Sequence, residues 1–220
     1  MIFFPTNYMP PDIRPVRRFI ACGLVLGALH ALPAWAGEEG QEPSLRRLTI
    51  EELSRIDVTT AMKHAEPVSD AAAAIQVITG DDIRRAGITT LPEALRLATG
   101  VHVARFDGHT WAISARGFNI STANKMQVMI DGRSIYTPLF GGVLWDIQDL
   151  MLADVDRIEV SRGPGATLWG ANAVNGVINI VTKPAAQTAG SLIQLGGGNL
   201  LGQTAVRYGR AMGTDSAFRV

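Results

Sequence analysis

The sequence predicts an exported protein of the α/β (α+β) class, in which a small mixed β-sheet with short helices precedes a few amphipathic strands. Three features of the chain predict this. An apolar segment near the N-terminus has the flanks of a signal peptide. Short runs rich in Val and Ile alternate with helix start and stop signals between residues 75 and 184, and a polar–apolar alternation follows in residues 185–220.

The first 36 residues have the parts of a signal peptide. Three arginines within residues 14–18 precede an uncharged run over residues 19–32, and Ala34-Trp35-Ala36 provides an A-x-A cleavage signal. The apolar run is too short to cross a bilayer comfortably. We therefore expect residues 1–36 to be removed. The only cysteine, Cys22, would leave with them, so the mature chain would have neither a thiolate metal ligand nor a disulfide.

The charge balance argues against a nucleic-acid partner. Lysine and arginine together number 20, as do aspartate and glutamate, so the formal net charge is zero. The sequence also contains no basic patch with interleaved aromatic residues. A polyanion would therefore meet no bulk electrostatic attraction.

Residues 37–74 are expected to form a tether with little packed structure. Glu, Gln, Pro and Ser dominate its first part, and alanines close it at residues 71–74. Thr49 and Glu52 have capping-box spacing, and apolar residues recur at every third position from Ile50. This pattern predicts one short amphipathic helix within the tether.

A strand at Ile75–Thr79 is expected to lead into two short helices. Two aspartates at residues 81–82 place negative charge in the first turn of the first helix, and Gly87 stops it. Thr90 is expected to cap the second helix, which has a proline near its first turn, and Gly100 ends that helix.

The remaining strands of the sheet are short apolar runs bounded by turn residues. They are expected at residues 101–105, 112–116, 126–131, 157–160 and 177–181, with one or two helical turns at residues 145–152.

The last part of the chain has the alternation of a strand with two different faces. Gln203, Ala205 and Arg207 alternate with Thr204, Val206 and Tyr208, and similar short pieces lie on either side. Transmembrane β-strands have this pattern, and so does any half-exposed hairpin. The alternation alone leaves both alternatives open.

A glycine-rich stretch, RIEVSRGPGATLWGANAVNGVINIVTK, occupies residues 157–183. Gly165 and Gly170 have the G-x-x-x-x-G spacing of a phosphate loop. The next two residues, however, are Ala171 and Asn172, where phosphate binding requires a lysine and a serine or threonine. The stretch therefore does not predict a nucleotide site.

The sequence offers no catalytic or metal site. The three histidines of the mature chain, His64, His102 and His109, have neither metal-ligand spacing nor a neighbouring nucleophile pattern. We therefore expect no enzymatic activity, no metal and no cofactor.

Four charged residues stand within or next to apolar strands, namely Arg116, Asp131, Glu159 and Arg162. A charge in this setting needs a partner or a wet cavity, because burying it alone is costly. The alternative, ordinary strand-edge charges that face water, stays open.

Three segments carry a resemblance to a known family, namely ISARGFN, MQVMIDGRSIYTP and VDRIEVSRGPGATLWGANAVNGVINIVTK. They resemble the plug domain of TonB-dependent outer-membrane receptors, over residues 58–183. The resemblance implies a plug domain at residues 75–184, lodged in a barrel of about 22 strands. It makes residues 37–74 a periplasmic tether and residues 185–220 the first two or three strands of an incomplete transmembrane β-barrel.

The resemblance also implies three sets of functional residues. The candidate TonB box, which would pair as an extended strand with TonB, is Ile56, Asp57, Val58, Thr59, Thr60 and Ala61. The candidates for ion pairing between plug and barrel are Arg116, Asp131, Glu159 and Arg162. The candidates for contact with the ligand in apical loops are Asp107, His109, Phe118, Asn119, Tyr136 and Phe140.

The function that the resemblance implies is energy-coupled uptake of a scarce ligand across the outer membrane. The ligand would be an iron chelate, cobalamin or a similar small molecule, and the partners would be TonB and the barrel of the same receptor. With so few barrel strands, the chain is expected to be a truncated receptor that does not transport alone. The alternative is a free periplasmic plug-like binding module.

Overall fold

The computed structural model describes residues 56–60, 63–71, 73–197, 202–213 and 216–220, all within one compact unit. The predictions of a signal peptide and of a helix near Thr49 fall outside these residues, as does Ala61. Within the described ranges, no helix is long and apolar enough to cross a membrane.

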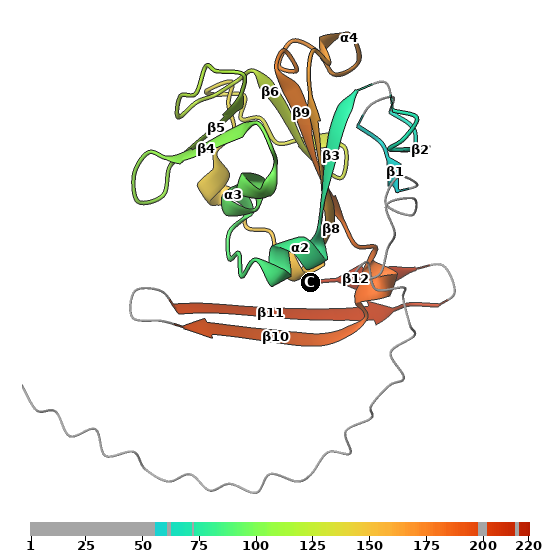
Figure 1. Cartoon of the computed structure of the whole chain (residues 1–220). Helices are drawn as coiled ribbons and strands as arrows, with labels where there is room; N and C mark the ends of the chain where they lie inside the picture. The colour runs from blue at the N-terminus through green and yellow to red at the C-terminus, as the bar shows by residue number, and fades with distance from the viewer. Residues whose placement is uncertain (1–55, 61–62, 72, 198–201, 214–215) are drawn as a thin grey trace, which may run out of the picture. The chain divides into compact units, whose positions relative to one another are not determined.

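The centre of the fold is a five-stranded mixed sheet with the order β3-β8-β9-β6-β7 (Figure 1). Strands β6 and β9 run parallel, and the other neighbours are antiparallel. The expected mixed sheet is thus confirmed. Its strands are β3 (Ala74–Thr79), β6 (Met126–Ile130), β7 (Arg133–Ser134), β8 (Val155–Arg162) and β9 (Gly176–Thr182).

One face of this sheet carries the main hydrophobic core. The register aligns Ile78 with Ile158 and Ile158 with Ile180, and all three side chains are buried. Helix residues Ile83 and Leu95 pack against this row within the same core cluster. Burying a side chain of this size contributes about 1.5–3 kcal/mol, so this face supplies most of the stability of the sheet.

Helix α2 (Gly80–Arg85) begins with a complete capping box. The Thr79 hydroxyl accepts from the backbone N–H of Asp82, and the Asp82 carboxylate accepts from the backbone N–H of Thr79. Partial burial raises the pKa of Asp82, but the hydrogen bonds from Thr79 and the contact with Arg85 outweigh it and lower the pKa. The expected helix start at residues 81–82 is therefore close to the observed one.

The second helix begins as expected but is capped differently. It consists of α3 (Leu91–Ala94) and a 3-10 turn, η2 (Leu95–Leu97), and a proline lies in its first turn. Thr90 stands at the N-cap position, yet its hydroxyl makes no capping hydrogen bond and is buried without a partner. Thr90 is thus the N-cap residue, as expected, but its side chain does not make the expected capping bond. The fixed φ of Pro92 favours the first turn of this helix.

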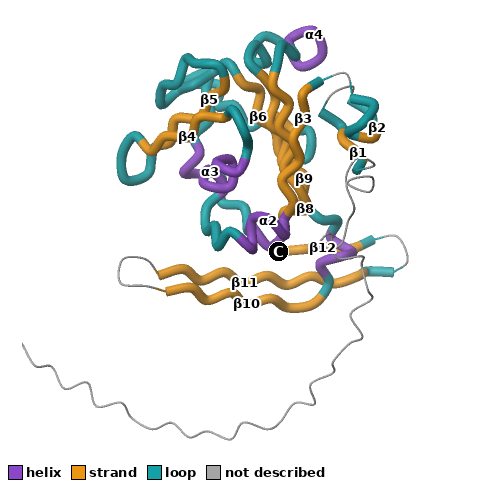
Figure 2. Tube along the Cα trace, viewed as in Figure 1, coloured by secondary structure: helices purple, strands orange, loops and turns teal. Residues whose placement is uncertain are grey.

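Strands β4 (Val101–Arg105) and β5 (Trp111–Ala115) pair with each other as a separate two-stranded hairpin. The expectation that the strands at residues 101–105 and 112–116 belong to the same sheet as the others is therefore wrong. The remaining elements are short, and Figure 2 distinguishes helical, strand and loop segments by colour. They are β1 (Asp57–Val58), β2 (Glu66–Pro67), η3 (Trp145–Ile147), η4 (Leu152–Asp154), α4 (Ala166–Trp169) and η5 (Ala185–Thr188).

The C-terminal strands form a three-stranded antiparallel sheet: β10 (Gly190–Gly197), β11 (Gly202–Ala211) and β12 (Ala217–Arg219). The register pairs Ile193 with Val206, and both side chains are exposed on one face. Arg207 points to the opposite face, toward the rest of the unit, where it contacts Asp154. Gly209 lies so close to η5 that a Cβ atom would come within 2.5 Å of the Thr188 carbonyl oxygen.

Candidate functional site

The residues just before the central sheet are docked on the sheet rather than free. We call residues 57–60 the docked segment. Its strand β1 pairs with β2, with Val58 opposite Glu66. Val58 and Thr60 are almost completely buried, at 0% and 2% exposure. The candidate TonB box therefore lies, as far as Thr60, in a packed environment.

Glu159, in the middle of β8, holds the docked segment. Its side chain is 0% exposed. Its Oε2 accepts hydrogen bonds from the backbone N–H of Thr59 and of Thr60, each at 3.0 Å, and from both threonine hydroxyls. Its Oε1 accepts from Arg157 Nε at 3.0 Å. A buried carboxylate is tolerated only with such partners, because removing it from water is costly.

Two further side chains complete this contact. Asn179 lies opposite Glu159 on β9, and its Nδ2 donates to the Thr59 hydroxyl at 3.3 Å. The Trp169 indole N–H donates to the Thr60 carbonyl at 2.7 Å. The ammonium group of Lys63 lies 4.9 Å from the centre of the Trp169 ring. The second face of the sheet is thus a polar site that the docked segment covers.

The glycine-rich stretch positions the tryptophan of this site. The backbone N–H of Gly165 donates to the Ala173 carbonyl at 2.8 Å, which closes the loop around α4. Asn175 anchors the end of the loop, because its Nδ2 donates to the Ala115 carbonyl at 2.8 Å. At Gly176 a Cβ atom would come within 2.3 Å of the Ser161 carbonyl oxygen, so only glycine fits. The loop packs against its own protein and does not form a phosphate cradle.

The four ion-pair candidates have separate environments. Asp131 accepts hydrogen bonds from the N–H and hydroxyl of Thr182, and Arg162 donates to the Thr99 carbonyl at 2.9 Å. Arg116 makes no hydrogen bond or ion pair with the described residues. Glu159 pairs with Arg157 at 3.0 Å. Contacts of these four residues with a barrel stay a prediction.

A different acidic residue joins the sheet region to the C-terminal strands. Asp154, 8% exposed, contacts Arg207 of β11 and lies 3.4 Å from Arg219 Nε of β12. The sequence reasoning missed this cluster. The alternation had placed Arg207 on the polar face of its strand, but acidic partners were expected on the barrel side and arginines on the plug side. In the observed pair the acidic residue, Asp154, belongs to the region before β8 and the arginine, Arg207, belongs to β11, which is the reverse of the expected arrangement.

The candidate ligand residues lie in three loops, and two of these loops contact each other. Gly142 packs against the backbone of Thr122, which joins the loop after β5 to the loop after β7. Phe118 and Phe140 are exposed in these loops, Phe118 at 71%. Phe118 also has a φ of 58°, a conformation that bulky residues rarely adopt. Such strained positions occur at ligand contacts.

Asn119 and Tyr136, in the same two loops, already have partners within the chain. The Asn119 side chain contacts the ring of His102. The Tyr136 hydroxyl donates to the Met126 carbonyl at 2.6 Å, and burial raises the pKa of Tyr136 to about 12. Of the four candidate residues in these two loops, therefore, the two phenylalanines are the exposed ones, and Ile120 and Leu139 beside them are exposed as well.

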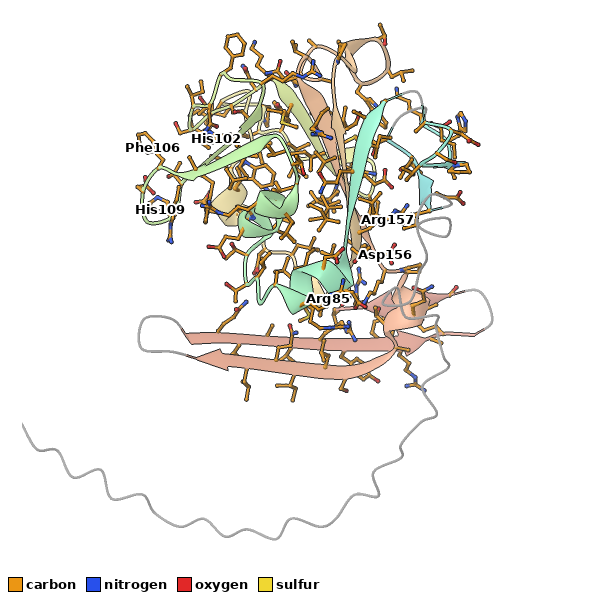
Figure 3. All side chains as sticks on the ribbon, viewed as in Figure 1. Arg85, His102, Phe106, His109, Asp156 and Arg157 are labelled. Carbon is orange, nitrogen blue, oxygen red and sulfur yellow. The ribbon has the colours of Figure 1, made fainter. Side chains whose placement is uncertain are left out.

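The third loop is the turn between β4 and β5. Figure 3 shows Phe106 and His109 at the end of this hairpin, with His102 farther back along the strand. The Asp107 carboxylate accepts from the backbone N–H groups of His109 and Thr110, and these bonds lower the pKa of Asp107 to about 2. Asp107 therefore stabilises its own turn. Among the described residues, no group of histidine, cysteine and acidic side chains could hold a metal.

Comparison with known proteins shows which family this chain resembles. Residues 67–177 match the family described as "TonB-dependent Receptor Plug Domain". The chain is 36% identical over 145 residues to the vitamin B12 transporter BtuB of Vibrio cholerae serotype O1, covering 65% of this chain and 23% of the relative. It is 31% identical over 170 residues to the iron-regulated outer membrane virulence protein of the same organism, covering 73% and 24%. The matches thus span about a quarter of the length of these relatives.

Solved structures agree with the fold. The ferric-catecholate import receptor Fiu from E. coli K12, in its open form, has a TM-score of 0.52 and 27% identity, covering 70% of this chain and 21% of that chain. The ferripyoverdine receptor of Pseudomonas aeruginosa has a TM-score of 0.56 at 22% identity, covering 72% and 20%, and shows the fold alone. These findings confirm the resemblance and the mixed α/β fold predicted from the sequence.

Proposed function

Because this chain belongs to the family of TonB-dependent receptor plug domains, we propose that it is the plug part of an outer-membrane receptor that takes up a scarce ligand with energy delivered through TonB. The family consists of transport receptors and not of enzymes. The ligand class, an iron chelate, cobalamin or a similar molecule, is supported by the printed functions of the relatives.

The observation that carries the proposal is the docked segment on the central sheet. TonB would pair with residues 56–61 as an added strand. Thr59 and Thr60 are bonded to Glu159, in the middle of β8. Because β8 lies between β3 and β9, a force applied to the segment would act directly on the centre of the plug.

The C-terminal sheet supports an outer-membrane location. Its exposed apolar side chains, among them Ile193, Leu195 and Val206, lie on one face and would meet lipid. Arg207 lies on the opposite face, where it contacts Asp154. We propose that this contact attaches the plug to the first barrel strands, and that Arg116 and Arg162 meet acidic residues elsewhere on the barrel wall.

Ligand contact is proposed for the apical loops. The exposed phenylalanines Phe118 and Phe140 would form an apolar surface for the ligand, with Asn119 and Tyr136 at its margin. Asp107 and His109 would contribute from the β4–β5 turn.

Cross-linking tests the TonB contact. A chain with Cys22→Ser and Asp57→Cys is co-expressed with TonB carrying single cysteines in its receptor-binding part. Disulfide formation at position 57 is expected to exceed that of a Ser69→Cys control, which is also exposed but lies beyond the segment. Equal cross-linking at the two positions, or recovery of the chain from the soluble periplasmic fraction, would favour the free binding module instead.

A further inference from the structure

We infer that Glu159 is the latch of the docked segment: its single carboxylate determines whether residues 57–60 lie closed on the sheet or are released. The inference rests on the proposed function in one respect, namely that residues 56–61 contact TonB. The latch itself is argued from the contacts of the segment alone.

The closed segment has few free groups with which to accept a partner strand. The backbone N–H groups of Thr59 and Thr60 both bond to Glu159, and the Thr60 carbonyl accepts from Trp169. Val58, in β1, already pairs with Glu66 of β2 and is completely buried. Strand addition requires free backbone N–H and C=O groups. The segment must therefore leave the central sheet, and β1 must separate from β2, before another strand can pair along its whole length.

Most of the hydrogen bonds between the segment and the central sheet converge on one oxygen atom. Glu159 Oε2 accepts four hydrogen bonds from Thr59 and Thr60, whereas Asn179 and Trp169 contribute one each. Bonds to an ionised acceptor are about twice as strong as neutral ones. Removing the charge of Glu159 would weaken all four bonds at once.

Release does not leave an unpaired charge behind. Arg157 stays on Oε1 of Glu159 at 3.0 Å, whereas the segment bonds to Oε2. Arg157 also contacts Asp156, at 2.7 Å, and its side chain is partly exposed. When the segment leaves, water can replace its N–H and hydroxyl groups at Oε2. The open state is thus accessible, and the contact can act as a reversible latch.

Cysteine labelling measures this opening. The full chain carries Cys22→Ser and a reporter, Val58→Cys, which is buried while the segment is closed. The rate of reaction with a charged maleimide then reports the open population. Glu159→Gln is expected to raise this rate at least tenfold, and Thr60→Val to raise it severalfold without altering the sheet. Asp156→Asn is the matched control, because this carboxylate also contacts Arg157 but does not touch the segment; its rate should stay within twofold.

A second reporter separates local release from unfolding. Val128→Cys lies in the core of the sheet, and its labelling should not respond to Glu159→Gln. The latch is overturned if Glu159→Gln leaves the rate at position 58 unchanged, accelerates both reporters equally, or acts no more strongly than Asp156→Asn. No TonB is present in this experiment. A latch that opens as expected in a chain that never cross-links to TonB would refute the proposed function and leave the latch intact.

Discussion

Replacing Asp154 by asparagine should weaken the attachment of the C-terminal sheet to the central region. Asp154 is 8% exposed and lies between Arg207, itself 14% exposed, and Arg219. Asparagine keeps the shape of the side chain but removes the negative charge, so that two arginines lose their counter-charge. Breaking a buried pair in this way costs about 3–5 kcal/mol. Because Arg219 also donates to the Lys183 carbonyl at 2.8 Å, we expect a loss near the lower end, about 3 kcal/mol.

Urea denaturation followed by tryptophan fluorescence measures this loss. With a slope of about 2 kcal/mol per molar urea, 3 kcal/mol lowers the midpoint by about 1.5 M. Asp149→Asn is a control, since that aspartate is exposed and should change the free energy of unfolding by less than about 0.5 kcal/mol. In Asp154→Asn/Arg207→Gln the total loss should fall short of the sum of the single losses by at least about 1 kcal/mol. Strictly additive losses, or an unchanged midpoint in Asp154→Asn, would refute this account of the contact.

Three further predictions follow from single residues. Gly176→Ala should lower the free energy of unfolding by about 1–3 kcal/mol, because the new Cβ would lie 2.3 Å from the Ser161 carbonyl oxygen; a variant as stable as the original in the same urea titration would contradict the close approach of β8 and β9. Tyr136→Phe should cost about 1 kcal/mol by loss of its bond to the Met126 carbonyl. Folding raises the pKa of Tyr136 to about 12, so the contribution of this tyrosine to the free energy of unfolding should decline between pH 10 and 12. An ultraviolet titration that shows its phenolate forming near pH 10 would speak against the buried bond. The carboxyl of Asp107 should titrate near pH 2 by NMR, so its contribution is present above about pH 4 and is lost as the pH falls toward 2; a midpoint near 4 would show that its bonds to the turn are absent.

The regular elements could be predicted because their signals are local. The strand expected at Ile75–Thr79 is observed as Ala74–Thr79, and the apolar runs around residues 158 and 178 became β8 and β9. Each was read from a few consecutive apolar residues and the glycines beside them. Thr90 occupies the N-cap position, but its hydroxyl makes no capping bond, and Pro92 at the second helical position has no N–H to offer it.

The site could be predicted only in part, because its contacts join distant segments. Residues 56–61 were recognised by resemblance, but nothing in their composition indicates that Thr60 would bond to Glu159. Glu159 itself was noted as a charge that needs a partner, which its apolar neighbours imply. The identity of that partner depends on how the segment folds back over the sheet. Asp154 was missed for the same reason, since its partners lie on β11 and β12.

The distance along the chain between the latch and its segment also determines when the two can meet. Thr60 and Glu159 are 99 residues apart, and closing so long a loop costs conformational entropy before any bond forms. Contacts of this range slow folding. The docked segment can therefore settle only once Glu159 and β8 are in place. Until then a newly made chain would present this segment to proteases and chaperones, so the last step of its maturation would also be the one that hides its most vulnerable stretch.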